Sequence, residues 1–147
     1  MKKLSVLLCV FLLTACAPSE VPLDKLVERN GIKYEVNSQT PFTGASIEYY
    51  ENGQLNEKIN YKDGMQHGLV ENYHEDGELS IKTNYKDGEK HGLAEVYREN
   101  GQLSGKVNWK DGTPHGLAES YDEDGKEYSS PPQCYQNGAE VDMSNCK

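Results

Sequence analysis

Residues 68–91 read GLVENYHEDGELSIKTNYKDGEKH and contain two turn signals, Glu75-Asp76-Gly77 and Lys86-Asp87-Gly88. Asp-Gly favours a β-hairpin because glycine adopts a positive φ without a Cβ clash. The stretches between the turns are short and contain Tyr, Val, Ile and Thr, which are enriched in strands. The sequence therefore predicts two antiparallel strands here.

The same pattern repeats along the chain with a period of 24 residues. Residues 44–67 and 92–115 are further full copies, and the copies at 68–91 and 92–115 agree at 14 of 24 positions. Residues 116–128 begin a fourth copy that stops halfway, while residues 31–43 look like a degenerate half unit. Self-similarity at a fixed period indicates stacked structural repeats, each of which packs on its neighbours.

The apolar pattern favours one register for the hairpin at Gly77. A two-residue loop scatters the hydrophobic side chains over both faces, whereas a three-residue loop with Gly77 left-handed gathers them on one face. Because a one-residue slip flips every side chain, we expect the second register. It predicts these neighbours: Tyr73 with Leu79, Leu69 with Thr83, Ile81 with Glu71, Tyr49 with Leu55, and Tyr97 with Leu103.

The predicted fold is all-β, an antiparallel meander of stacked hairpins that forms an open, curled single sheet or solenoid. One face is expected to be polar, with Asn72, Ser80, Lys82 and Asn84. A single sheet cannot hide its own apolar face, so the aromatic side chains there are either the core of the curled sheet or a surface for a partner. This aromatic stripe comprises Tyr49, Tyr61, Tyr73, Tyr85, Tyr97, Trp109 and Tyr121.

The N-terminus has the layout of an export signal. Lys2 and Lys3 precede an apolar run, residues 4–13, that is too short to span a membrane. The stretch Leu13-Thr14-Ala15-Cys16 resembles a bacterial lipobox, which implies that Cys16 is acylated and becomes the first mature residue. Similarity to lipoprotein sorting rules implies that Ala17 permits delivery to the outer membrane in a Gram-negative cell.

These signals divide the chain into four segments. In the segment that follows the signal peptide, Asp24 to Arg29 has room for one turn of helix. The segments are a lipoprotein signal peptide (residues 1–15), a lipidated tether with a short N-terminal cap (16–30), the repeat domain (31–128) and a disulfide-closed C-terminal tail (129–147).

The charge and the cysteines limit the partners and the compartment. The formal net charge of −9 disfavours nucleic acid and anionic lipid headgroups as electrostatic partners. Membrane attachment is therefore expected to come from the acyl chains on Cys16. In an oxidising compartment, the remaining pair, Cys134 and Cys146, is expected to form a disulfide.

The recurring polar residues do not predict catalysis. His67, His91 and His115 lie one repeat apart, about 10 Å for two strands, so one metal ion at about 2 Å from each nitrogen cannot reach two of them. The recurring Glu and Asp residues suit turn chemistry and solubility. The sequence contains no nucleophile elbow and no phosphate-binding loop before a helix. We therefore expect no enzyme activity, no metal and no cofactor.

The repeat resembles the bacterial variant of the MORN repeat, in which Tyr-x-x-x-Gly and Tyr-Lys-Asp-Gly motifs alternate. The first motif is present at Tyr49/Gly53, Tyr73/Gly77, Tyr97/Gly101 and Tyr121/Gly125, and the second begins at Tyr61 and Tyr85, with Trp109 replacing Tyr in the third copy. Such proteins are often labelled antitoxin components of the YwqK family, which implies binding to a toxin. MORN proteins are also associated with protein scaffolding and phospholipid.

The expected function is a membrane-anchored, non-catalytic scaffold that binds a protein in the bacterial cell envelope. Two alternatives remain open at this point. One is an antitoxin-like protein that neutralises a toxin partner, and the other is a structural envelope protein that associates with itself through open sheet edges or its apolar face.

Overall fold

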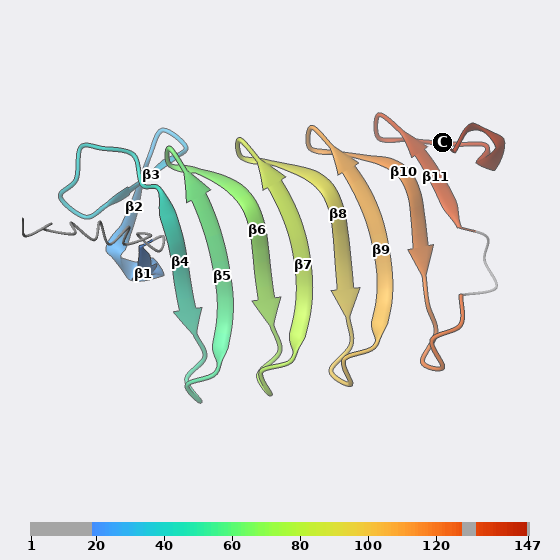
Figure 1. Ribbon diagram of the computed structural model, residues 1–147, viewed down its shortest axis with the longest axis horizontal. Coiled ribbons are helices and arrows are strands. Elements are labelled where there is room, and N and C mark those ends of the chain that lie inside the picture. Colours follow the sequence, from blue (N-terminus) through green and yellow to red (C-terminus); the bar gives the residue numbers. More distant parts are fainter. Residues whose placement is uncertain (1–18, 128–131, 147) are drawn as a thin grey trace, which may run out of the picture.

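The computed structural model describes residues 19–127 and 132–146, and most of this part of the chain forms one long, open sheet (Figure 1). The predictions made for the signal peptide and for Cys16 lie outside the described residues. Within the described ranges, no helix is long and apolar enough to cross a membrane.

Ten strands of the described chain form the sheet, in the order β1-β4-β5-β6-β7-β8-β9-β10-β11-β12. Only β1 and β4 pair in parallel, so the predicted all-β antiparallel meander is confirmed from β4 onward. The strands are β1 (Glu20–Pro22), β4 (Gly44–Tyr49), β5 (Leu55–Lys62), β6 (Met65–Tyr73), β7 (Leu79–Lys86), β8 (Glu89–Tyr97), β9 (Leu103–Lys110), β10 (Thr113–Ser120), β11 (Gln133–Gln136) and β12 (Ala139–Val141).

A separate hairpin covers the start of the array. Its strands are β2 (Leu26–Arg29) and β3 (Ile32–Glu35), and the 3₁₀ turn η1 (Leu23–Lys25) precedes them. The helical turn allowed for residues 24–29 is therefore wrong beyond Lys25, because residues from Leu26 onward pair with β3. The hairpin docks on the first Lys-Asp-Gly turn, where Lys33 N donates to Gly64 O at 2.9 Å.

The three-residue loop predicted at Gly77 is confirmed. His74 N donates to Glu78 O at 2.8 Å and closes the loop, and Gly77 has a φ of 91°. The predicted pair Tyr73–Leu79 is present, and so are its equivalents Tyr49–Leu55 and Tyr97–Leu103.

The pairs predicted beyond this loop are wrong because of a bulge. Tyr73 pairs with Leu79, but Asn72 pairs with Ile81, so Ser80 is an extra residue in β7. Leu69 consequently lies opposite Asn84 instead of Thr83, and Ile81 lies opposite Asn72 instead of Glu71. An inserted residue reverses the facing of all that follow, so Ile81 lies on the opposite face from Tyr73.

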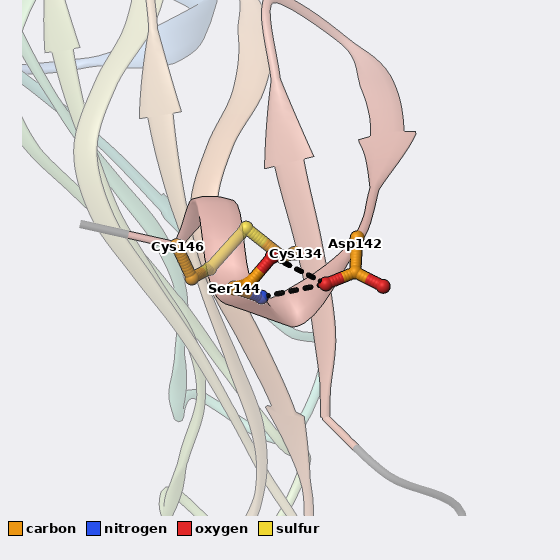
Figure 2. The surroundings of a disulfide bond; sticks show 4 residues. All are labelled: Cys134, Asp142, Ser144 and Cys146. Atoms are coloured by element: carbon orange, nitrogen blue, oxygen red, sulfur yellow. Dashed lines mark hydrogen bonds between the residues drawn. A yellow bond between two sulfur atoms is a disulfide. The ribbon is translucent and has the colours of Figure 1, made fainter.

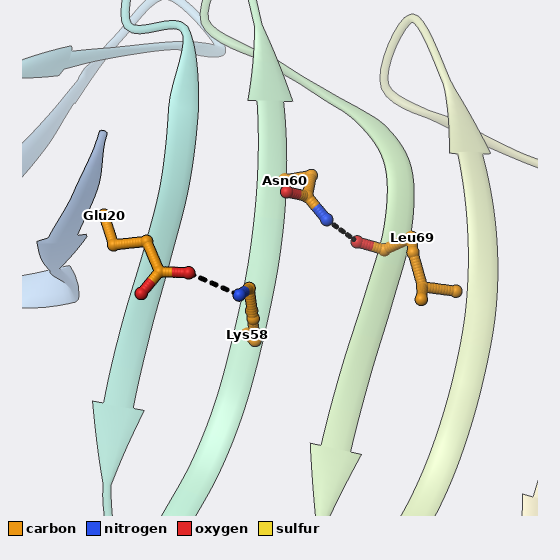
Figure 3. Close-up of polar contacts among 4 residues, drawn as sticks. All are labelled: Glu20, Lys58, Asn60 and Leu69. Carbon is orange, nitrogen blue, oxygen red and sulfur yellow. Dashed lines mark hydrogen bonds and ion pairs between the residues drawn. The ribbon is translucent and has the colours of Figure 1, made fainter. Parts of the chain in front are cut away.

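A second bulge lies near the other end of each repeat. Ile59 pairs with Val70 and Tyr61 with Gln66, which leaves three residues of β6, among them Gly68 at φ 84°, opposite Asn60 alone. Asn60 Nδ2 donates to Leu69 O at 2.7 Å across this bulge (Figure 3). In the next repeat, Asn84 donates to Leu93 O at 3.1 Å. The His-Gly-Leu motif therefore marks a bulge that an asparagine from the preceding strand closes.

The two faces of the sheet differ in composition. We call one the cap face, because the hairpin and Phe42 pack on it at the start of the array. Its central row reads Ser46, Ile59, Val70, Thr83, Ala94, Val107 and Ala118 across successive strands. The core cluster of Leu26, Phe42, Ile59, Tyr61 and Val70 lies here. The opposite face, the ladder face, has the central row Ile47, Lys58, Glu71, Lys82, Glu95, Lys106 and Glu119.

Candidate functional site

The aromatic stripe predicted for one face is divided between the two faces. Tyr61 is buried in the core cluster and Tyr85 packs against it, which places both on the cap face. Tyr73 instead lies beside Lys58 and Glu71 on the ladder face. By strand alternation, Trp109 joins the cap-face set, while Tyr49, Tyr97 and Tyr121 join the ladder-face set. The prediction of a single stripe is therefore wrong, and the bulges at Asn56, Ser80 and Ser104 are its physical cause.

On the cap face, each large ring lies opposite a glycine. Tyr61 pairs with Gly44, Tyr85 with Gly68 and Trp109 with Gly92. An aromatic ring opposite a glycine covers backbone that has no side chain of its own. These rings therefore stabilise the strands at the glycine positions. Because the aromatic side chains are divided between two faces, whether they form a core or a binding surface has to be decided for each face separately.

The buried core cluster lies at the N-terminal end of the cap face, although Thr83 and Ala94 in its central row are also buried farther along. Beyond the hairpin, Ile81 and Val96 lie opposite each other and remain 38% and 41% exposed. Trp109 lies on the same face in β9, four residues beyond Gly105, which pairs with Val96, and Lys90 Nζ sits 4.6 Å from its ring centroid. We call these three residues, Ile81 and Val96 at one level of the face and Trp109 beyond its central row, the apolar strip. It is a surface on which a partner can bury apolar area.

On the ladder face, lysine and glutamate alternate across six strands. Lys106 Nζ lies 3.0 Å from Glu119 Oε2, whereas Lys82 Nζ and Glu95 Oε2 are 3.9 Å apart. Lys58 donates to Glu20 in β1 (Figure 3). Opposite charges directly across a strand pair stabilise a sheet by about 0.2–1 kcal/mol each, so the charge ladder, defined by Lys58, Glu71, Lys82, Glu95, Lys106 and Glu119, contributes to repeat stacking.

Ionisation at the two ends of the charge ladder follows from these contacts. The hydrogen bond to Glu20 raises the pKa of Lys58, and the bond to Glu119 raises the pKa of Lys106. Hydrogen bonds from Tyr121 and Lys106 lower the pKa of Glu119. On the cap face, burial raises the pKa of Tyr61. These contacts therefore favour the charged forms of Lys58, Lys106 and Glu119.

Two of the recurring histidines, His67 and His91, contact the turns of the following repeat. His67 Nδ1 lies 3.2 Å from Asp87 Oδ1, and His91 Nδ1 lies 3.3 Å from Asp111 Oδ1. Among residues 19–127 and 132–146, no three His, Cys, Asp or Glu side chains are grouped as metal ligands would be. The contacts of His67 and His91 join neighbouring repeats.

A groove of about 570 Å³ lies on the ladder face at the C-terminal end of the array. Cys146 forms part of its lining because a disulfide to Cys134, with Cα atoms 5.6 Å apart, holds the 3₁₀ turn η2 (Met143–Asn145) beside β11 (Figure 2). Asp142 Oδ1 accepts from Ser144 N at 2.9 Å and caps this turn. His91, His115 and Lys110 also line the groove, which has the size of a small-molecule site.

The comparisons with known proteins agree with this geometry. The family model described as the MORN repeat variant matches residues 42–63, 66–87 and 90–111. The chain carries three MORN repeats. The match covers nearly all of β4 to β9, so the MORN repeats are the units that form both faces. Neither the curated proteins nor the solved structures gave a match to the chain.

Two features of the MORN array were missed from the sequence. Strands β11 and β12 extend the sheet, with a two-residue turn at Asn137-Gly138. The hairpin β2–β3 has the same turn at Asn30-Gly31, where both residues have positive φ. The Asn-Gly dipeptide was the available signal in each case. The charge ladder was also missed, because the predicted register placed Glu71 and Lys82 on opposite faces.

Proposed function

We propose that this protein is a non-catalytic binding module whose MORN repeats hold a protein partner in the bacterial cell envelope, with a lipid on Cys16 as the membrane anchor. The observation that carries the proposal is the apolar strip. Ile81 and Val96 are more than a third exposed although their row belongs to the face that forms the core upstream.

The chemistry of the apolar strip indicates the kind of partner. Trp and Tyr are enriched in protein interfaces because they bury large areas with few rotatable bonds. The negative net charge of the chain favours a partner with basic groups around an apolar contact. The partner expected from this combination is a protein with a flat apolar patch and a basic rim.

A non-catalytic role is supported by how the recurring polar residues are used. His67 and His91 contact aspartates of the next turn, and the ladder carboxylates face lysines. These recurring side chains contribute to stacking, which supports binding as the role of the exposed surface.

Site-specific photo-crosslinking in cells tests the apolar strip. A photoreactive residue at Ile81 or Val96 should give one discrete crosslinked protein product. The matched control is Val36, which is 47% exposed and lies in the cap, away from the strip. The same product from all three positions, or no product from Ile81 and Val96, would contradict the proposal. A toxin in the product would identify the antitoxin-like function.

Membrane fractionation tests the anchor. Cys16→Ser removes the acylation site and should move the full chain from the membrane fraction to the soluble fraction, because acyl burial at about 0.8 kcal/mol per methylene is the expected source of attachment. Cys9→Ser, within the expected signal peptide, is the control and should leave fractionation unchanged. Retention of Cys16→Ser on membranes would refute the anchor and leave the binding proposal standing.

A further inference from the structure

The charge ladder, which stabilises the sheet within one chain, also has a symmetry that suits a second copy. Six residues at one level of the sheet, one from each strand β5 to β10, alternate strictly in sign: Lys58, Glu71, Lys82, Glu95, Lys106 and Glu119. Because the number is even and the signs alternate, the row read backwards has the opposite sign at every position. Such a row is complementary to a reversed copy of itself.

We propose that two copies of this protein associate through their ladder faces, about a two-fold axis that runs parallel to the strands between β7 and β8. This axis places Lys82 of one copy opposite Glu95 of the other, and every other ladder residue opposite a residue of opposite charge. A two-fold axis along the row would instead place each charge opposite itself, so the alternation selects the first arrangement.

The centre of the row is where an added partner gains most. The outer lysines have close carboxylate partners within the chain, since Lys58 donates to Glu20 and Lys106 lies 3.0 Å from Glu119. At the centre, Lys82 and Glu95 are 3.9 Å apart, and their side chains are 40% and 21% exposed. A second copy completes a square of alternating charges from two Lys82 and two Glu95 side chains.

An apolar row on one side of the charge ladder supplies area to bury. Tyr73, Leu79, Tyr97 and Leu103 form this row. The row on the other side alternates Leu69 and Leu93 with Asn84 and Asn108. The proposed axis keeps the strand direction, so each row meets itself in reverse and Leu79 lies opposite Tyr97 of the second copy. The charged row thus sets the register of the pair, while the row of Tyr and Leu side chains adds hydrophobic contact.

A charge-swap experiment tests this pair in full-length protein. Two differently tagged versions of the chain are expressed together, and recovery of one with the other is measured from detergent-solubilised membranes. Lys82→Glu alone and Glu95→Lys alone should each lower co-recovery about tenfold, because each puts like charges together twice. Lys82→Glu mixed with Glu95→Lys should restore it, since both contacts then join opposite charges.

The controls are Lys86→Glu and Glu99→Lys, which make the same charge changes at exposed turn-end positions. They should leave co-recovery at the wild-type level. The restored mixture itself shows that both variants fold. The proposal is overturned if wild-type copies are not recovered together, if either ladder variant pairs with itself as the wild type does, or if the mixture fails to pair while both variants melt cooperatively.

Discussion

The hydroxyl of Tyr50 donates to the carbonyl oxygen of Tyr73 at 2.6 Å, which joins the loop of one repeat to the end of a strand in the next. His74 makes the equivalent contact with Tyr97 O at 3.1 Å, and Arg98 donates to Tyr121 O. The residue after the repeat tyrosine therefore binds the same carbonyl of the following repeat, although its chemistry differs at each step.

Tyr50→Phe should destabilise the array by about 1 kcal/mol, because it removes one partly buried hydrogen bond and keeps the ring. Tyr49→Phe is the matched control, since Tyr49 is 57% exposed. Chemical denaturation of the two variants measures the difference in unfolding free energy. Equal midpoints for both variants would show that the Tyr50 contact adds nothing to stacking.

Gly64→Ala should cost more than Gly88→Ala, although both glycines occupy the same turn position at φ 80° and 89°. Strain at positive φ costs about 1–2 kcal/mol in either variant. A Cβ at Gly64 would in addition lie 2.3 Å from Ile32 Cγ2 and 2.8 Å from Lys33 O, whereas one at Gly88 meets no described atom within 4 Å.

The extra cost at Gly64 is expected to be about 1–3 kcal/mol, as for overpacking elsewhere. Thermal unfolding of both variants measures it. If Gly88→Ala proved as damaging as Gly64→Ala, the docking of the β2–β3 hairpin on the first turn would not be as close as described.

Alkaline pH should destabilise the fold through Tyr61. Burial raises the pKa of this phenol in the folded state, so the folded chain holds the proton more tightly than the unfolded chain. Stability is therefore lost as the pH rises past about 10, the ordinary value for tyrosine. Tyr61→Phe keeps the ring, cannot ionise, and should show a shallower fall in melting temperature with pH.

Tyr49→Phe is the control for this titration and should keep the wild-type slope, because the exposed Tyr49 ring gives no comparable burial. An unchanged alkaline slope in Tyr61→Phe would remove Tyr61 as the source of the effect.

Reduction of the Cys134–Cys146 disulfide should lower stability by about 3 kcal/mol, the chain-entropy value for a loop closed over 12 residues. The loss should concentrate at β11 and β12, since the bond holds η2 beside them. Hydrogen exchange with and without reductant measures this. The amides of β6 and β7 serve as an internal control, and equal loss of protection throughout the sheet would contradict a local role.

The repeat period and the tight turns could be predicted from the sequence because Asp-Gly has few backbone alternatives to a hairpin turn. The closing pair Tyr73–Leu79 followed from the three-residue loop that the apolar pattern favoured. The facing of Ile81 could not be predicted in the same way, since Ser80 fits a regular strand as well as a bulge. Asn56, Ser80 and Ser104 occupy this position in successive repeats, and only the pairing shows what they do there.

Prediction of the charge ladder also required knowledge of the bulge in each hairpin. Lysines 58, 82 and 106 and glutamates 71, 95 and 119 recur every 24 residues, so each set was visible as a repeat. Whether the two sets meet is decided by the extra residue in each hairpin, which shifts their relative facing by one position. Sequence periodicity therefore identified the repeating side chains but not their neighbours across the strands.

The contacts from Tyr50, His74 and Arg98 also have a consequence for chain length. Since each repeat presents the same carbonyl and receives the same kind of bond, removal of residues 68–91 would let Tyr50 meet Tyr97 O as it now meets Tyr73 O. Duplication of the same segment would add one more junction of the same kind. Gain or loss of whole repeats would therefore lengthen or shorten the sheet in steps of about 10 Å. Both ends of the array would stay intact.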